Sequence, residues 1–155
     1  MLNKNMERCS SMKEKIVDWL KNYCETNNLK SFVVGISGGI DSAVTSTLCA
    51  ETGINTIAVS MPIHQHPSQI DRANRHIEWL ESKYSNISKE LIPLTHVYDT
   101  FEMQFADNPN ELALANTRAR LRMTTLYYIA QSNNGLVVGT GNKVEDFGVG
   151  FFTKY

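Results

Sequence analysis

The stretch Phe32-Val-Val-Gly-Ile-Ser-Gly-Gly-Ile-Asp-Ser42 decides the fold of this chain. Its first half is apolar and rich in β-branched residues, which is typical of a buried strand at the centre of a sheet. Gly38 and Gly39 lack a Cβ atom, so the backbone turns tightly there and a ligand can approach it closely. The stretch therefore predicts a strand, a tight turn and the start of a helix.

The residues after the turn indicate a site for phosphate. Residues 40–51 carry apolar side chains at helical spacing, so the free N–H groups of the first helical turn point at the loop. Ser37 and Ser42 add hydroxyl donors. Asp41 adds a carboxylate, which is unfavourable beside an anion unless a Mg²⁺ ion lies between the two. We therefore expect a phosphate site with a divalent cation.

The glycine spacing excludes two common phosphate loops. A Walker A loop needs Gly-Lys-Ser/Thr, and no lysine lies between Gly35 and Ser42. A dinucleotide fingerprint needs G-x-G-x-x-G, which these glycines do not form. The remaining pattern, S-G-G-x-D-S, resembles the pyrophosphate loop of the ATP pyrophosphatases, which cut ATP between its α and β phosphates. A turn without a ligand is the alternative, but such a turn has no use for two serines and an aspartate.

Length and composition limit the classes of protein to which this chain can belong. The 155 residues are enough for one ordinary domain. With 15 Lys and Arg against 16 Asp and Glu, no basic field predicts a nucleic-acid partner. Apolar runs are too short for a membrane span, and the first residues lack the apolar core of a signal peptide. The 3 cysteines form no C-x-x-C pair, which suits free thiols in the cytoplasm.

Hydrophobic periodicity predicts alternating strands and helices. A capping box at Ser11 and Glu14 predicts the start of a helix that ends near residues 27–28. We expect strands at 32–36, 55–61, 90–95 and 135–139, and helices at 40–51, 68–83, 97–105 and 109–132. This order predicts an α/β fold, a doubly wound parallel sheet flanked by helices, with ligands at the carboxyl ends of the strands. The Gly-rich turns after Ile36 and Val138 both fall at such ends and indicate one site.

An arginine-rich segment, Asn116-Thr-Arg-Ala-Arg-Leu-Arg-Met123, lies in the last predicted helix. Arg118 and Arg122 are four residues apart and share a face, while Arg120 points roughly opposite. Arginine suits phosphate and carboxylate because its planar group makes paired hydrogen bonds. For Arg118 or Arg122 taken alone, a solvated helix face is the favoured interpretation.

The segment Gly139-Thr-Gly-Asn-Lys-Val-Glu-Asp146 follows the last predicted strand. Thr140 is a candidate nucleotide contact, and Glu145 or Asp146 could supply a second Mg²⁺ ligand opposite Asp41. An ordinary Gly/Asn turn with exposed charges is the alternative. The chain closes on G-F-F-T-K-Y, where a lone Lys154 would ordinarily lie at the surface.

The order S-G-G-I-D-S, N-T-R-A-R-L-R-M, G-T-G-N-K-V-E-D and G-F-F-T-K-Y resembles the NAD synthetase family of the N-type ATP pyrophosphatases. The resemblance covers Phe32 to Tyr155. It implies the adenine nucleotide alpha hydrolase-like fold. It also implies a ligase that uses ATP to join ammonia to deamido-NAD through an adenylated intermediate, releasing AMP and pyrophosphate. No protein nucleophile is expected.

The resemblance also implies roles for individual residues. Asp41 and Glu145 would be the Mg²⁺ ligands, although counting back from Phe151 points to Asp146 instead. Arg120 and Lys154 would bind deamido-NAD. ATP would be bound by Gly35, Ile36, Ser37, Gly38, Gly39, Ile40, Asp41, Ser42 and Thr140.

Family members continue beyond the K-Y pair, so residues 1–155 are expected to form one domain that is incomplete at its C-terminus. The resemblance implies a cytoplasmic homodimer that uses free ammonia. Two rival interpretations are another ATP pyrophosphatase, of the GMP synthetase or tRNA-thiolating type, and an ATP-binding fragment without turnover. A third is a metal site built from His64 and His66 with His76 or His96.

Overall fold

The computed structural model describes residues 2–149, except for the side chains of 2–10, 145, 146 and 149. Its centre is a four-stranded sheet in the order β3-β2-β1-β4. Every neighbouring pair in this sheet is parallel. The strands are β1 (Ser31–Gly35), β2 (Asn55–Ser60), β3 (Ile87–Leu91) and β4 (Gly135–Val137). The predicted parallel α/β sheet is confirmed.

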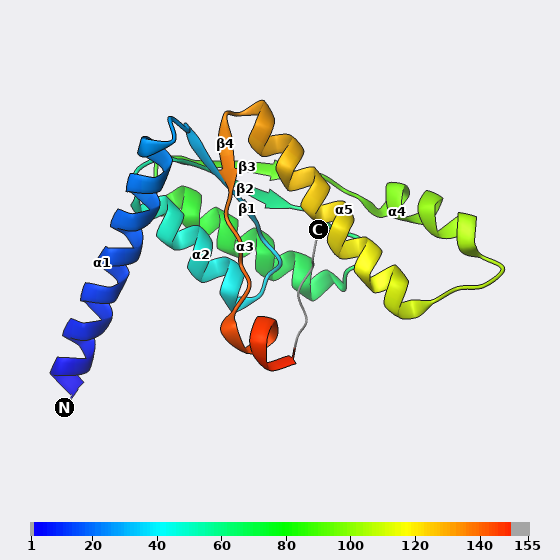
Figure 1. Ribbon diagram of the computed structural model, residues 1–155, viewed down its shortest axis with the longest axis horizontal. Helices are drawn as coiled ribbons and strands as arrows, with labels where there is room; N and C mark the ends of the chain where they lie inside the picture. The colour runs from blue at the N-terminus through cyan, green and yellow to red at the C-terminus, as the bar shows by residue number, and fades with distance from the viewer. Residues whose placement is uncertain (1, 150–155) are drawn as a thin grey trace.

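Helices cover both faces of the sheet (Figure 1). On one face lie α1 (Leu2–Thr26), α2 (Ile40–Glu51) and α3 (Pro67–Lys83). On the other lie α4 (Thr95–Glu102), which continues into the short 3₁₀ turn η1 (Met103–Phe105), and α5 (Glu111–Ser132). A single π-helical turn, η2 (Val144–Val149), follows β4. The doubly wound arrangement is therefore also confirmed.

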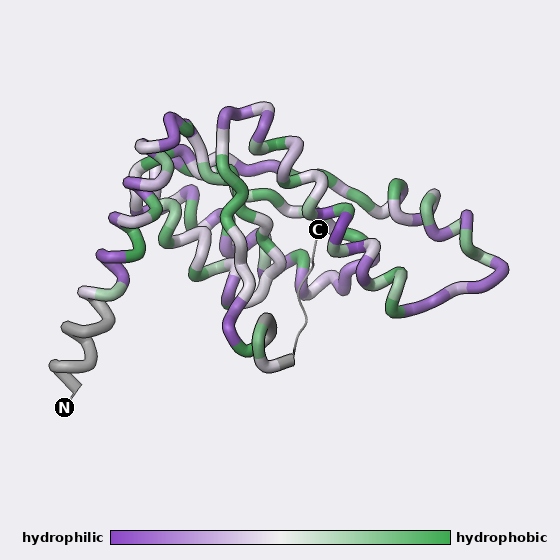
Figure 2. The backbone as a smooth tube through the Cα atoms, in the orientation of Figure 1, coloured by the Kyte–Doolittle hydropathy of each residue, from purple (hydrophilic) through white to green (hydrophobic). Residues whose placement is uncertain are grey.

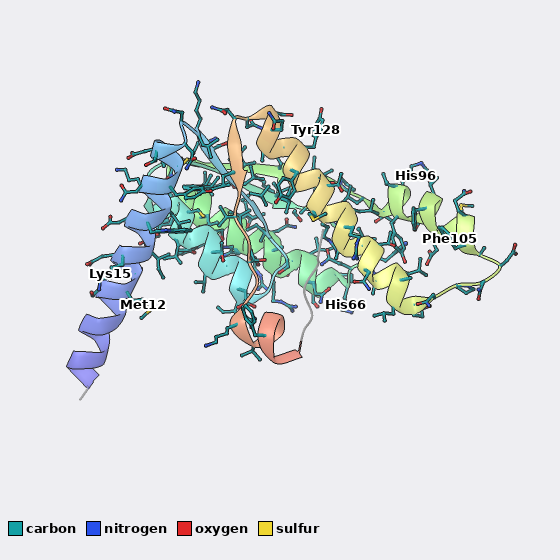
Figure 3. All side chains as sticks on the ribbon, viewed as in Figure 1. Met12, Lys15, His66, His96, Phe105 and Tyr128 are labelled. Atoms are coloured by element: carbon teal, nitrogen blue, oxygen red, sulfur yellow. The ribbon has the colours of Figure 1, made fainter. Side chains whose placement is uncertain are left out.

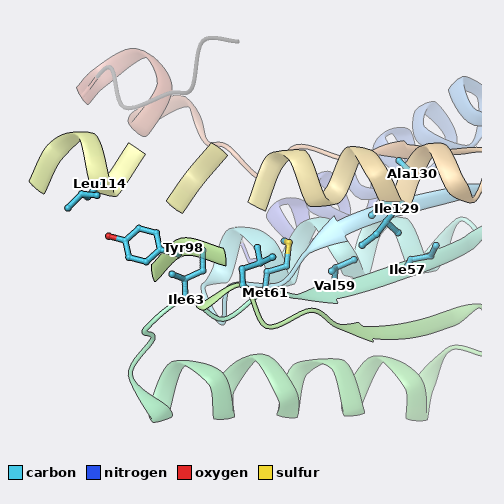
Figure 4. Packing of buried hydrophobic residues seen from close by; sticks show 10 residues of the cluster. Ile57, Val59, Met61, Ile63, Tyr98, Leu114, Ile129 and Ala130 are labelled. Carbon is cyan, nitrogen blue, oxygen red and sulfur yellow. The ribbon is translucent and has the colours of Figure 1, made fainter. Parts of the chain in front are cut away.

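Two apolar clusters hold these layers together. The strands present alternate side chains to opposite faces, so Val33 packs toward α5 whereas Phe32 and Val34 pack toward the first three helices. Figure 4 shows the first cluster, in which Ile57 and Val59 of β2 lie near Ile129 of α5, and Tyr98 of α4 lies beside Ile63, which follows β2. In Figure 2 the hydrophobic colour follows the central strands, while the loop that joins η1 to α5 is hydrophilic.

The predicted start of the first helix is wrong. Ser11 and Glu14 lie inside α1, which begins at Leu2. The residues before Ser11 include leucine, lysine, methionine, glutamate and arginine, all of which favour helix, so nothing in the sequence stops the helix from extending upstream.

The third strand also lies elsewhere than predicted, at Ile87–Leu91 rather than at 90–95. It is an edge strand whose register with β2 runs from Ile87 opposite Thr56 to Leu91 opposite Ser60. Pro93 has no N–H group to continue the ladder, so the strand ends before it. Hydrophobic periodicity did not reveal this edge strand, because its middle carries the charged residues Lys89 and Glu90, of which Lys89 is exposed and Glu90 is half-buried.

The starts of two other helices differ by two residues from the predicted ones. The last long helix begins at Glu111 rather than 109, because Asn110 caps it: its Oδ1 atom accepts a 3.0 Å hydrogen bond from the Ala113 N–H. The α4 helix begins at Thr95 rather than 97. Within the described range, no helix is both long and apolar enough to cross a membrane.

Candidate functional site

The loop between β1 and α2 has a backbone that only glycine can adopt at its centre. Gly38 has a φ of +83°, in the left-handed region. A Cβ atom built there would lie 2.6 Å from the Gln69 carbonyl oxygen of α3, a distance at which something must shift. The packing of the loop against α3 therefore requires glycine at position 38.

Serine hydroxyl groups organise the loop from within. The Ser37 N–H donates to Ser42 Oγ at 3.3 Å, and the Gly39 N–H donates to Ser37 Oγ at 3.2 Å. Ser42 Oγ in turn donates to the Gly39 carbonyl at 3.0 Å. Hydroxyl oxygens thus satisfy N–H groups that could equally donate to an oxygen of a bound anion.

The start of α2 adds further donors. Its N-cap residue is Gly39, which has no side chain and so leaves the N–H groups of the first turn without a side-chain acceptor. Such a helix start favours a negatively charged ligand. With the two hydroxyl groups of Ser37 and Ser42, it forms a set of donors suited to a phosphate.

The two Gly-rich turns meet, as the sequence predicted. The Asn142 amide Nδ2 atom donates to Asp41 Oδ2 at 3.3 Å, which joins the first turn of α2 to the segment after β4. Hydrogen bonding of β4 alongside β1 brings them together, since Val33 pairs with Val137 and the Val138 N–H donates to the Val33 carbonyl. The carboxyl ends of these two strands therefore share one edge of the sheet.

A cavity of about 300 Å³ opens beside this edge, between the end of β1 and helix α5. Pockets of this size can hold a nucleoside-sized ligand. Arg122 reaches in from α5, and its Nε atom donates to the Met61 carbonyl at 3.0 Å. The cavity is lined by Gly35, Ile36, Ser37, Met61, Gln65, Ala119, Arg122, Met123, Leu126 and Thr140.

Predicted site residues divide into those at the cavity and those away from it. Gly35, Ile36, Ser37 and Thr140 line the large cavity. Gly38, Gly39 and Ser42 line an adjoining hollow of about 40 Å³ that also contacts α3. Ile40 begins α2 at the same edge, with its side chain exposed.

Arg120 is not among the cavity residues. Its side chain is exposed and donates to the Asn116 carbonyl of its own helix at 3.2 Å. The Glu145 and Asp146 side chains and the whole of Lys154 lie outside the described residues.

The donor set at this edge fits a magnesium ion that is shared with a phosphate. Mg²⁺ is usually held by one or two protein carboxylates together with substrate phosphate oxygens, rather than by an all-protein cage. Asp41 supplies one half-exposed carboxylate beside the loop. Within the described part of the chain, no three His, Cys, Asp or Glu side chains gather as a metal-binding group, so a phosphate would have to supply the remaining ligands.

The sequence-based interpretation of Arg118 and Arg122 as a solvated face is wrong. Arg118 donates to the Tyr98 hydroxyl at 2.8 Å and lies over that ring at 5.3 Å. Arg122 lines the cavity, and burial, with the charge of Arg118, lowers the pKa of its guanidinium. Their shared helical face was predictable from the spacing. That this face turns toward the ends of the strands was not.

The histidines do not form the metal site considered from the sequence. His64 pairs with Asp99, whereas His66 caps α3 by accepting from the Ser68 N–H. His76 contacts Ser46 Oγ through Nε2 at 2.8 Å. Figure 3 shows His66 and His96 on separate elements. The described histidine side chains therefore do not converge on a shared metal-binding position.

Comparison with known proteins identifies the family. A sequence model described as NAD synthase matches residues 12–155, most of the chain. The chain belongs to the NAD synthase family. The relatives bear this out, since it is 40% identical over 143 residues to the NH(3)-dependent NAD(+) synthetase of Finegoldia magna, covering 92% of this chain and 57% of that protein. The corresponding enzyme of Carboxydothermus hydrogenoformans is 37% identical, with 58% of its length covered.

Solved structures of the family have the same fold. The NMN synthetase of Francisella tularensis matches with a TM-score of 0.85 and 35% identity, covering 94% of this chain and 59% of that one. An NH3-dependent NAD synthetase from Campylobacter jejuni matches with a TM-score of 0.82 and 31% identity, covering 93% and 61%. The predicted adenine nucleotide alpha hydrolase-like fold is confirmed. The chain spans under two thirds of each of these proteins.

Proposed function

We propose that this chain carries the ATP-binding part of an ammonia-dependent NAD synthetase. The reaction amidates the nicotinate carboxylate of deamido-NAD. The carboxylate attacks the α-phosphate of ATP, pyrophosphate leaves, and ammonia then displaces AMP from the acyl adenylate. The observation that carries the proposal is the meeting of the loop, Asp41 and the segment after β4 at one edge, beside a cavity of about 300 Å³.

The proposed ATP site uses the cavity and the loop together. The cavity, with Thr140 and Gly35 in its lining, holds the nucleoside, and the loop from Ser37 to Ser42 holds the phosphates. Charge develops on the phosphates as pyrophosphate departs, so fixed N–H and hydroxyl donors lower the barrier without any covalent step by the protein. Ser37 and Ser42 act in this proposal as donors and not as nucleophiles.

The proposed metal is Mg²⁺, with Asp41 as one ligand and Glu145 as the second. When bound, Mg²⁺ neutralises phosphate charge and makes pyrophosphate a better leaving group. The support from geometry is the position of Asp41 in the first turn of α2, where its carboxylate faces Asn142 of the opposite turn.

The proposed deamido-NAD contacts are Arg120 and Lys154. Arg120 has an exposed guanidinium outside the ATP cavity, and the N–H groups that do not donate to the Asn116 carbonyl can meet a carboxylate or phosphate. Free ammonia is the proposed nitrogen donor.

The proposed assembly is a cytoplasmic homodimer in which residues 1–155 are part of one domain. Support for the dimer comes from exposed apolar side chains on α5: Leu112, Tyr127 and Tyr128 have exposed fractions of 68%, 61% and 74%. Figure 3 shows Tyr128 at the outer side of the molecule. Single exposed aromatic residues are ordinary, whereas contiguous exposed apolar side chains indicate an interface, and Tyr127 and Tyr128 are adjacent in the sequence. Equilibrium sedimentation should detect a dimer, and a monomer at every concentration would count against it.

A second candidate substrate follows from the similarity to an NMN synthetase. The same adenylation and ammonia steps would amidate nicotinate mononucleotide instead of deamido-NAD. Offering both substrates in parallel decides between them, since the preferred one gives the larger kcat/KM.

The deciding experiment is NAD formation from deamido-NAD, Mg-ATP and ammonium, with pyrophosphate measured in parallel. Equal amounts of NAD and pyrophosphate would support the proposal. Mg-ATP binding without NAD would favour an ATP-binding fragment that lacks turnover. If neither NAD formation nor nucleotide binding is detected, the proposed function is overturned.

A further inference from the structure

Helix α3 packs directly behind the phosphate loop. A Cβ atom on Gly38 would lie 2.6 Å from the Gln69 carbonyl oxygen and 3.3 Å from the Ala73 nitrogen. The first two turns of α3 therefore touch the loop at its tightest point, and any side chain projecting from this part of α3 toward the loop lies next to the phosphate donors.

Arg72 is such a side chain. Its Nε atom donates to the Gly38 carbonyl oxygen at 3.3 Å. Among the described residues its remaining guanidinium N–H groups have no hydrogen-bond or ion-pair partner. Arginine has five N–H donors in a rigid plane, so a single bond through Nε leaves both terminal nitrogens available to an anion.

Arg72 and the loop donors share one small hollow. It has a volume of about 40 Å³ and is lined by Ile36, Gly38, Gly39, Ser42, Ala43, Arg72 and His76. A polar hollow of this size has room for a water molecule or a single anion oxygen. His76 lies one turn beyond Arg72 and is bonded to Ser46 Oγ at 2.8 Å, which ties α3 to α2 beside the hollow.

The loop itself supplies no full positive charge to a bound phosphate. From Gly35 to Ala43 the sequence contains one acidic residue, Asp41, and no basic one. Pyrophosphate carries several negative charges, and backbone N–H groups offer only partial positive charges in return. A guanidinium beside the loop adds a full positive charge with geometry suited to phosphate oxygens.

We propose that Arg72 is a phosphate-binding residue of this site, holding the Gly38 carbonyl through Nε and the pyrophosphate end of ATP through its terminal nitrogens. The inference rests on the proposed function for the identity of the ligand. The geometry on which it stands, a guanidinium with free terminal nitrogens in the same hollow as the loop donors, does not depend on the proposed function.

The test is calorimetric titration of the full chain with inorganic pyrophosphate and, separately, with adenosine, in the presence of Mg²⁺. Arg72→Gln keeps an N–H donor but removes the charge. It should weaken pyrophosphate binding about 10-fold or more while adenosine binding stays unchanged. Arg72→Lys keeps the charge and should lose only about 3-fold. The matched control is Arg75→Gln on the exposed face of α3, where Arg75 pairs with Asp71 at 3.6 Å.

Three outcomes overturn the inference. Pyrophosphate binding in Arg72→Gln equal to that in Arg75→Gln would show that Arg72 does not meet the anion. Equal losses of pyrophosphate and adenosine binding would show that Arg72 only braces the fold. Absence of pyrophosphate binding by the unsubstituted chain would also reject it. If pyrophosphate binds through Arg72 but no NAD forms, the proposed function fails while this inference stands.

Discussion

Asn142 and Asp41 are 101 positions apart in the sequence, yet the Asn142 Nδ2 atom lies 3.3 Å from Asp41 Oδ2. Each residue follows a strand of the parallel sheet, and β1 and β4 are hydrogen-bonded neighbours in that sheet. The contact therefore joins the two turns that border the candidate site, the one before α2 and the one after β4. The Asn142 amide donor orients the Asp41 carboxylate toward the segment after β4.

Asp41→Asn should reduce Mg²⁺-dependent NAD formation by about 100-fold or more, because it removes the charged ligand while preserving its shape. Steady-state assays across a range of Mg²⁺ concentrations measure this change. Asp107→Asn, an exposed substitution in the loop before α5, is the control and should have no effect. Equal activity of the two variants would exclude Asp41 as a ligand.

Gly38→Ala should destabilise the protein more than Gly53→Ala. Both glycines have positive φ values, +83° and +76°, so each alanine costs about 1 kcal/mol of backbone strain. Only Gly38 also meets a backbone atom, the Gln69 oxygen at 2.6 Å, whereas nothing lies within 4 Å at Gly53. The clash adds about 2 kcal/mol, which urea unfolding resolves. Equal midpoints for the two variants would show that the loop can move away from α3.

Ala119→Leu should fill part of the large cavity and block the nucleoside. Ala119 lines this cavity from α5, so the larger side chain should weaken adenosine binding about 10-fold or more. Pyrophosphate binding at the loop should be retained. Thr124→Leu, exposed on the same helix, is the control for general effects on α5. A parallel loss of adenosine and pyrophosphate binding would contradict the division of the site into two parts.

His76 should make stability fall as the pH is lowered. Burial lowers the pKa of this histidine below its ordinary value of 6.5, so the folded state favours the neutral ring. The unfolded chain takes up a proton first as the pH falls through 6.5, and the free energy of unfolding decreases until the folded ring also titrates. The stabilisation that comes from the neutral His76 ring is therefore complete above the unfolded-state pKa of 6.5.

Unfolding measured at several pH values between about 7 and about 5 tests this dependence. His76→Gln should flatten the decline, whereas His96→Gln, at an exposed site on α4, should leave it as it is. An unchanged slope in His76→Gln would assign the decline to other groups.

Local pattern was enough to predict much of the fold and the loop. The β-branched run before Gly35 and the glycines after it predicted β1 and the start of α2, because strand, tight turn and helix start each depend on neighbouring residues. The position of β3 was missed, since its exposed edge carries Lys89 and Glu90 where periodicity needs apolar residues.

The sequence by itself therefore determined the order of elements, the Gly-rich loop between β1 and α2, and the expectation that two Gly-rich turns would share an edge. Only the tertiary structure decided which polar side chains face that edge. Arg122 in the cavity and Arg72 behind the loop look like surface arginines in the sequence. Their direction depends on how α5 and α3 pack across the sheet, and contacts between residues far apart in the chain leave no local pattern.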